Sequence, residues 1–128
     1  MGFLDFLFPK VLTRRQLTSV DDRKIRDEWG EIEDLVKIGK PSALKEAVVK
    51  ADKLMDYALI KIVDGVTMGE RLKNAKERFS YEGYDKVWKA HKVRNAIAHE
   101  IDYDPPHFIT KEAVENFRVS FSDLGINL

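Results

Sequence analysis

The sequence contains no cysteine among its 128 residues. Disulfide bonds and thiolate catalysis are therefore excluded, and so is any zinc site that depends on sulfur ligands. No apolar run approaches the roughly 20 residues that a membrane-spanning helix needs. The first residues do not resemble a signal peptide either, because Asp5 interrupts the apolar stretch and no small-residue cleavage site follows. These absences predict a cytoplasmic location.

Net charge is also lacking, because 22 basic and 22 acidic side chains cancel. The overall charge therefore points to no particular partner. A composition of 44% hydrophobic and 34% charged residues is typical of soluble globular proteins. A chain of this length suits one domain with a single core. We find no β alternation and no internal repeat.

Apolar residues instead recur every three or four positions, which predicts helices. The expected long helices cover residues 19–38, 42–63 and 84–101, and a last one capped by Thr110 runs to about Gly125. Ser19 is the expected cap of the first helix, and Thr67 with Glu70 forms a capping box that opens a short helix. Residues 80–83 are expected to be a loop. The predicted fold is all-α, an antiparallel bundle of four main helices plus a short helix.

The N-terminal residues differ in composition from the rest, so we divide the chain into an apolar segment with a linker (1–18) and a bundle domain (19–128). Residues 3–8, from Phe3 to Phe8, are strongly apolar. We expect them to pack on the bundle or across a dimer. Peripheral contact with a membrane surface is the alternative, although the segment has no basic face of its own.

Charge is locally uneven between Arg71 and Arg94, where eight basic residues face three acidic ones, a balance of 8 − 3 = +5. Lys86, Lys89 and Lys92 are part of this run and are our candidates for RNA contacts. A solvated helix face is the alternative interpretation, because lysine-rich surfaces are usually that.

The residues best suited to chemistry lie in the predicted helix 84–101. Its buried stripe is expected to comprise Val87, Ala90, Val93 or Arg94, Ile97 and Ile101. A second line of polar residues, His91, Asn95 and His99, repeats every four positions on a neighbouring face. Imidazole transfers protons near neutral pH, and the guanidinium of Arg94 offers donors that match phosphate oxygens. This combination favours chemistry on phosphate esters.

The segment Arg94-Asn95-Ala96-Ile97-Ala98-His99 resembles the signature of the HEPN superfamily, in which an Arg and a His stand four to six residues apart. A polar residue, often Asn, commonly follows the Arg in that family. The segment lies on the penultimate long helix of an all-α bundle, as it does in HEPN proteins, and the similarity covers about residues 19–124. The resemblance implies a homodimer in which two motif helices face each other.

For active members, the resemblance also implies metal-independent RNA cleavage at a composite dimer site, typically by toxins and antiviral effectors. A protein antitoxin or another partner is then expected, and no cofactor or metal. Some toxins paired with a nucleotidyltransferase antitoxin carry a Tyr two residues after the motif His. Ile101 occupies that position here, and Tyr103 is expected to pack near the site instead.

In this mechanism His99 acts as general base or acid, Arg94 stabilises charge on the phosphate, and Asn95 orients the substrate or His99. His91 lends a second imidazole or a hydrogen bond. Arg94 and His99 are five residues apart, about 140° around an ideal helix. A long arginine side chain, a distorted helix end or a partner protomer must therefore bring them together.

Structural roles are the alternatives: an interface histidine for His99, and for Arg94 a salt bridge to an acidic residue of another helix. The alternative function is a non-catalytic dimer that binds nucleotide or a protein, and a scaffold on a membrane is a third. Trp88, His91, Asn95 and His99 would form a semi-polar exposed strip on a monomer, which also predicts a homodimer through this helix.

Overall fold

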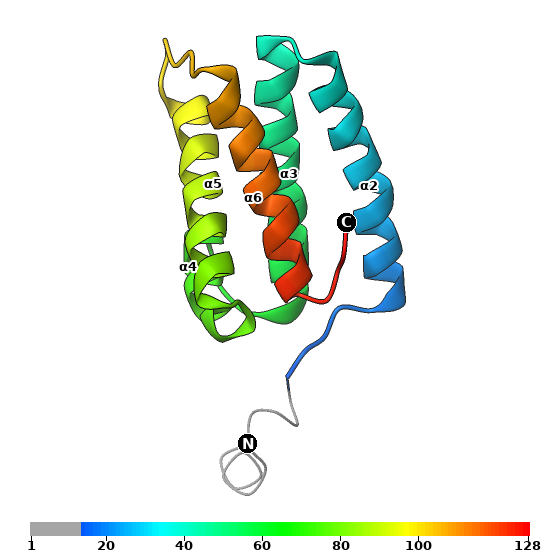
Figure 1. The fold of residues 1–128 in the computed structure, drawn as a ribbon. Helices are drawn as coiled ribbons and strands as arrows, with labels where there is room; N and C mark the ends of the chain where they lie inside the picture. Colours follow the sequence, from blue (N-terminus) through cyan, green and yellow to red (C-terminus); the bar gives the residue numbers. More distant parts are fainter. Residues whose placement is uncertain (1–13) are drawn as a thin grey trace, which may run out of the picture.

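The structure, a computed structural model, describes residues 14–128. The expectation for residues 3–8 therefore lies outside the described part of the chain. The described helices are α2 (Ser19–Ile38), α3 (Pro41–Ile62), α4 (Met68–Asn74), the 3-10 helix η2 (Lys76–Arg78), α5 (Tyr81–His99) and α6 (His107–Asp123). The four long helices alternate in direction along the chain (Figure 1). The prediction of an all-α bundle with four main helices and a short one is confirmed.

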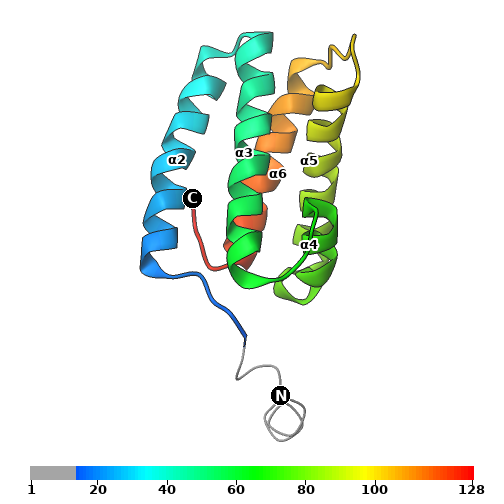
Figure 2. The same ribbon diagram turned by 180° about the vertical axis from the view of Figure 1, so that it is seen from behind.

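Helix α3 is the centre of the bundle, since it contacts α2, α4, α5 and α6 (Figure 2). Its apolar face is fully buried around Met55 and Leu59, as expected for core positions. Trp29 of α2 meets Phe121 of α6 edge to face, with ring centroids 6.0 Å apart. The core therefore ties together helices that are distant in sequence.

The start of α2 differs from the prediction, because Thr18 and not Ser19 is its cap. The Thr18 hydroxyl accepts a hydrogen bond from the Asp21 N–H, and the Asp21 carboxylate accepts one from the Thr18 N–H. This reciprocal pair forms only when the cap is three residues before the acid. At the other end, Gly39 adopts the left-handed conformation with φ of 73°, which glycine favours at the end of a helix.

Helix α5 begins earlier than expected, because residues 80–83 are not a loop. The Ser80 hydroxyl caps the helix by accepting from the Gly83 N–H, and Asp123 of α6 accepts from both the N–H and the hydroxyl of Ser80. A Cβ on Gly83 would clash with that Asp123 carboxylate. Glycine at this position is therefore a packing requirement and not a sign of a loop.

The end of α5 also differs from the prediction. The helix stops at His99, and Ile101 is 99% exposed, so its expected burial is wrong. Val87 and Ala90 are buried as predicted, while Val93 and Ile97 are half-buried. Because the chain must turn before Pro105, the backbone leaves the helix early and the Ile101 side chain faces solvent.

Helix α6 starts at His107, three residues before the expected cap. Thr110 lies inside the helix, and its hydroxyl donates to the carbonyl of His107. Pro106 stands at the cap position, where its restricted backbone suits a helix start. The Thr67 cap of α4 is confirmed, but the Glu70 carboxylate accepts from Val66 and not from Thr67.

Residues 14–18 are fastened to the bundle. Arg15 pairs with Asp64 at 2.9 Å, and Arg78 donates a hydrogen bond to the carbonyl of Arg15. Leu17 packs against the core. Within residues 14–128, no helix has the length and apolar character to cross a bilayer.

Candidate active site

A cleft of about 730 Å³ lies between α3, the start of α4 and the C-terminal half of α5. We call it the Arg94 cleft. It gathers Arg94, Asn95 and His99, the three residues predicted to be catalytic, together with His91. The opposite side is formed by Asp52 and Asp56 of α3 and by residues 67–69.

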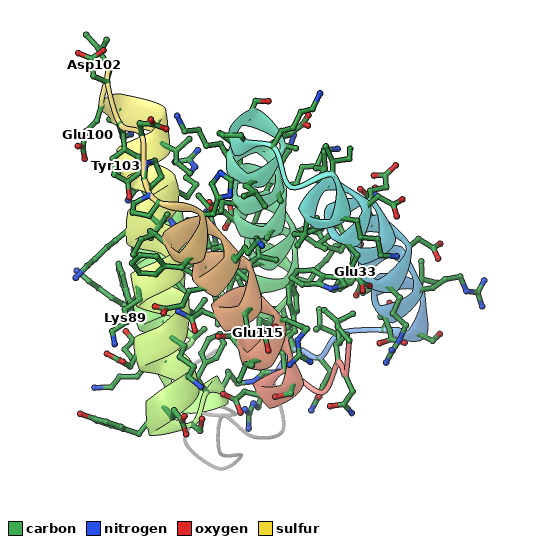
Figure 3. The ribbon with its side chains drawn as sticks, turned by 45° about the horizontal axis from the view of Figure 1, so that its top comes forward. Glu33, Lys89, Glu100, Asp102, Tyr103 and Glu115 are labelled. Carbon is green, nitrogen blue, oxygen red and sulfur yellow. The ribbon has the colours of Figure 1, made fainter. Side chains whose placement is uncertain are left out.

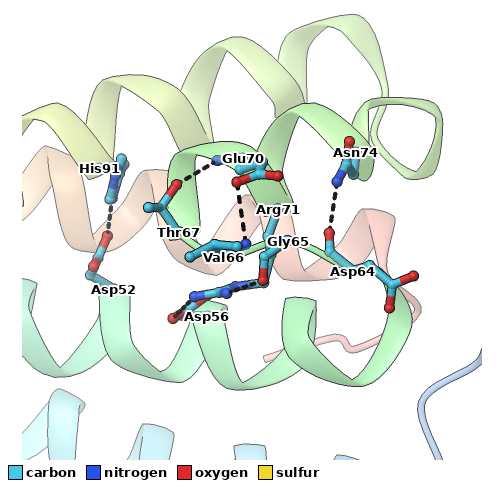
Figure 4. A network of polar contacts seen from close by, with 10 residues as sticks. All are labelled: Asp52, Asp56, Asp64, Gly65, Val66, Thr67, Glu70, Arg71, Asn74 and His91. Atoms are coloured by element: carbon cyan, nitrogen blue, oxygen red, sulfur yellow. Dashed lines mark hydrogen bonds and ion pairs between the residues drawn. The ribbon is translucent and has the colours of Figure 1, made fainter.

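The floor of the cleft is a pair formed by Asp52 and His91 (Figure 4). The His91 Nδ1 is 2.8 Å from Asp52 Oδ1, and both residues are less than a tenth exposed. A carboxylate only accepts hydrogen bonds, so the His91 Nδ1–H donates to Asp52 Oδ1. The expectation that His91 belongs to an exposed strip is therefore wrong, because Asp52 draws the ring into the bundle.

Arg94 contacts the same carboxylate from the outer side. Its Nε is 3.5 Å from Asp52 Oδ2, and its Nη1 donates to Asn95 Oδ1 at 3.1 Å. The side chain is about one-third exposed. The ion pair with an acid on another helix, which the sequence left as an alternative, is thus present. A guanidinium has five N–H donors, so these two contacts leave others that can bind a phosphate.

The position of Arg94 relative to His99 can be described from the residues that line the cleft. Both line it within a single chain. The arginine reaches toward α3, while His99, the last residue of α5, is exposed at the mouth. Asn95 is half-buried one turn before His99. The helical spacing therefore does not require a partner protomer for Arg94 and His99 to line one cleft.

One wall of the cleft is fixed by Arg71, which the sequence analysis counted among the basic residues near the motif. Its Nε and Nη2 bind both oxygens of Asp56 at 2.7 and 2.9 Å, and Nη1 donates to the Gly65 carbonyl at 2.8 Å (Figure 4). The hydrogen bonds that Arg71 donates to the Asp56 carboxylate raise the pKa of Arg71 above its usual value. Arg71 therefore holds the loop before α4 against α3.

Sequence reasoning missed Asp52 and Asp56, although a signal for Asp52 was present. It lies on α3 between Val48 and Met55, within the apolar stripe. A buried acid on such a stripe needs a basic or hydrogen-bonding side chain as its partner, and a neighbouring helix can supply it. No comparable signal identifies Asp56.

The predicted RNA-binding lysines lie outside the Arg94 cleft. Lys86 pairs with Glu82 at 2.9 Å and Lys89 pairs with Asp85 at 3.3 Å, so each lysine charge is partly neutralised by its partner. Lys92 is exposed. Lys89 is on the outer side of α5 (Figure 3). Contact of these three lysines with RNA stays a prediction.

Tyr103 is not among the residues that line the Arg94 cleft. It lies on the loop after α5 (Figure 3), where its carbonyl accepts a hydrogen bond from Lys45 at 2.7 Å. Its contact with α3 therefore runs through the backbone.

Within residues 14–128, no three His, Asp or Glu side chains are grouped so that they could hold a metal ion. No protein-family model, curated protein or solved structure matches the chain.

Proposed function

We propose that this protein is a metal-independent endoribonuclease of the HEPN type. The observation that supports the proposal is the Arg94 cleft, in which Arg94, Asn95 and His99 line one open space above the buried Asp52–His91 pair. An arginine and an exposed imidazole in one cleft supply charge stabilisation and proton transfer, the two needs of phosphodiester cleavage.

In the proposed reaction, the ribose 2′-oxygen attacks the adjacent phosphorus. His99 removes the 2′-hydroxyl proton as general base, or donates a proton to the leaving 5′-oxygen as general acid. Arg94 binds the phosphate oxygens, on which negative charge develops. The P–O5′ bond breaks, which leaves a 2′,3′-cyclic phosphate and a free 5′-hydroxyl. DNA lacks the 2′-hydroxyl and is not a substrate.

Asp52 and Asn95 have positioning roles in this proposal. The carboxylate of Asp52 faces Arg94 Nε, and the amide oxygen of Asn95 accepts from Nη1. Both contacts restrict the guanidinium before the substrate arrives, which lowers the entropy lost on binding. His91 is hydrogen-bonded to Asp52, and in this proposal it lends a second imidazole or only a hydrogen bond.

The homodimer belongs to this proposal as well. Two α5 helices that face each other would bring two Arg94 clefts together, and one phosphate would then contact Arg94 of one protomer and His99 of the other. A role as a toxin or antiviral effector, with an antitoxin partner, follows only from the resemblance in the sequence.

A second function has one observation in its favour. Arg94 is already engaged by Asp52 and Asn95, as a purely structural arginine would be. In that case the protein is a non-catalytic HEPN-like dimer that binds nucleotide or a protein partner.

The deciding experiment incubates the purified protein with single-stranded RNA in excess chelator. We expect cleavage with a 2′,3′-cyclic phosphate or its opened product. His99→Ala and Arg94→Ala should each lower the rate by about 10²- to 10⁴-fold while helix content is unchanged. Matched controls are His107→Ala and Arg23→Ala, which alter exposed residues outside the cleft. RNA left intact by the wild type, or cut equally by all variants, would favour the non-catalytic function.

Mixing the two inactive variants tests the composite site. Heterodimers regain activity if Arg94 of one protomer and His99 of the other suffice. Light scattering that shows a monomer at micromolar concentration would contradict the dimer.

A further inference from the structure

A second cleft, of about 790 Å³, lies at the N-terminal end of α5. Four aromatic side chains line it: Phe79, Tyr81, Tyr84 and Trp88. We call it the aromatic cleft. Tyr81 is 95% exposed, and Tyr84 and Trp88 are half-buried. Phe79 is only 9% exposed, so Tyr81, Tyr84 and Trp88 are the rings whose apolar faces a ligand can cover.

The aromatic rings form a continuous row that ends in the Arg94 cleft. Ring centroids are 6.2 Å apart from Phe79 to Tyr84, 6.3 Å from Tyr84 to Trp88, and 5.9 Å from Trp88 to His91. Trp88 also lies against Gly69, which lines the Arg94 cleft. Trp88, which lines the aromatic cleft, therefore lies beside both His91 and Gly69 of the Arg94 cleft.

The polar groups around the aromatic cleft suit a nucleotide. Lys76 Nζ is 5.8 Å from the Tyr84 ring centroid, where it can approach a phosphate beside the rings. Asp85 is paired with Lys89, so its charge is partly neutralised. Glu77 also lines the cleft and can accept hydrogen bonds from the amino groups of a base.

We propose that the aromatic cleft binds an unpaired nucleobase of single-stranded RNA, close to the nucleotide whose phosphate occupies the Arg94 cleft. Stacking on aromatic rings is the common means by which proteins bind single-stranded nucleic acid, because every base has a flat π face. Bases in a duplex are already stacked and cannot enter such a cleft. The identification of RNA as the natural ligand rests on the proposed function, whereas base binding itself does not.

The test measures binding of a single-stranded DNA oligonucleotide of about eight nucleotides, which carries bases but lacks the 2′-hydroxyl needed for cleavage. The anisotropy of a dye on the oligonucleotide gives the affinity of every variant. In the wild type a decrease in tryptophan fluorescence should also report stacking on Trp88, since the second tryptophan, Trp29, is buried in the core. Trp88→Ala should weaken the affinity by about 5- to 150-fold, the usual range for loss of one stacked base. Tyr81→Ala should weaken it in the same direction without affecting folding, since its side chain is exposed.

Phe108→Ala is the matched control, because Phe108 is an exposed aromatic residue outside the cleft and should leave affinity unchanged. A duplex of the same sequence should bind at least tenfold more weakly. No binding by the wild type, equal affinity for the duplex, or unchanged affinity in both Trp88→Ala and Tyr81→Ala overturns the proposal. Dissociation of a dimer in these variants with unchanged affinity also overturns it, and identifies a second copy of the chain as the occupant.

Failure of this proposal can be told apart from failure of the proposed function. If RNA cleavage requires Arg94 but oligonucleotide affinity is unchanged in Trp88→Ala and Tyr81→Ala, only the proposed base site is contradicted. If the protein cuts no RNA but oligonucleotide binding depends on Trp88, the base site is supported. The nuclease function is then contradicted, and the nucleotide-binding alternative is favoured.

Discussion

Replacing Asp52 by alanine removes the carboxylate that holds both His91 and Arg94. Asp52 is 4% exposed and lies 2.8 Å from His91 Nδ1, so the variant leaves a buried ring nitrogen without its acceptor. Losing a hydrogen bond to a charged group costs about 1.5–3 kcal/mol. The Arg94 pair is longer, at 3.5 Å, and one-third exposed, so it adds about 0–1 kcal/mol.

The expected loss for Asp52→Ala is therefore about 1.5–4 kcal/mol in the free energy of unfolding. For a chain of this size each kcal/mol shifts Tm by roughly 4 °C, which predicts a decrease of about 6–16 °C. Asp52→Asn keeps the volume and can still accept from His91, so we expect a smaller decrease. Both variants should lower the rate of RNA cleavage at least tenfold, because Arg94 is no longer held in place.

Urea unfolding of Asp52→Ala, His91→Ala and the double variant tests this reasoning directly. Residues in one hydrogen-bonded pair should show a coupling energy of roughly 0.5–3 kcal/mol. Additive effects of the two substitutions, or a Tm for Asp52→Ala within about 2 °C of the wild type, would refute the role given to the Asp52–His91 pair.

Two further predictions concern stability. Arg71→Lys should lower the free energy of unfolding by about 1.5–3 kcal/mol in urea titrations, because lysine cannot bind both oxygens of Asp56 and the Gly65 carbonyl at once. Asp21→Asn should make the protein less sensitive to acid. Hydrogen bonds from the Thr18 N–H and the Tyr57 hydroxyl lower the pKa of Asp21 in the folded state. The ionised Asp21 carboxylate therefore contributes its full stabilisation above the unfolded pKa of about 3.9, and this stabilisation is lost as pH falls through the lower folded pKa.

Each stability prediction has a control on the exposed face of α2. Arg23→Lys should unfold at the wild-type urea concentration, and a loss as large as that of Arg71→Lys would mean that the contact with Asp56 is not the cause. For the acid prediction, the fall in Tm between pH 7 and about pH 3 is compared in Asp21→Asn and Asp27→Asn. An equal fall in both variants contradicts the role of Asp21.

Most of the helices could be predicted from the sequence, and so could the position of Arg94, Asn95 and His99 on one of them. Helix period and the local stop and start signals at Gly39 and Thr67 act over three or four residues, so they can be recognised without the fold. Arg94, Asn95 and His99 lie within two turns of one helix, and for that reason the sequence could predict that they share a site.

The tertiary structure decided what surrounds those residues, because each of these contacts joins segments that no local pattern connects. His91 is buried because the carboxylate of Asp52, 39 residues earlier, accepts a hydrogen bond from its Nδ1. Helix α5 starts at Tyr81 because Asp123, 43 residues after Ser80, binds the cap. Helix packing sets which side chains meet across the bundle, and helical periodicity specifies only which face of each helix turns inward.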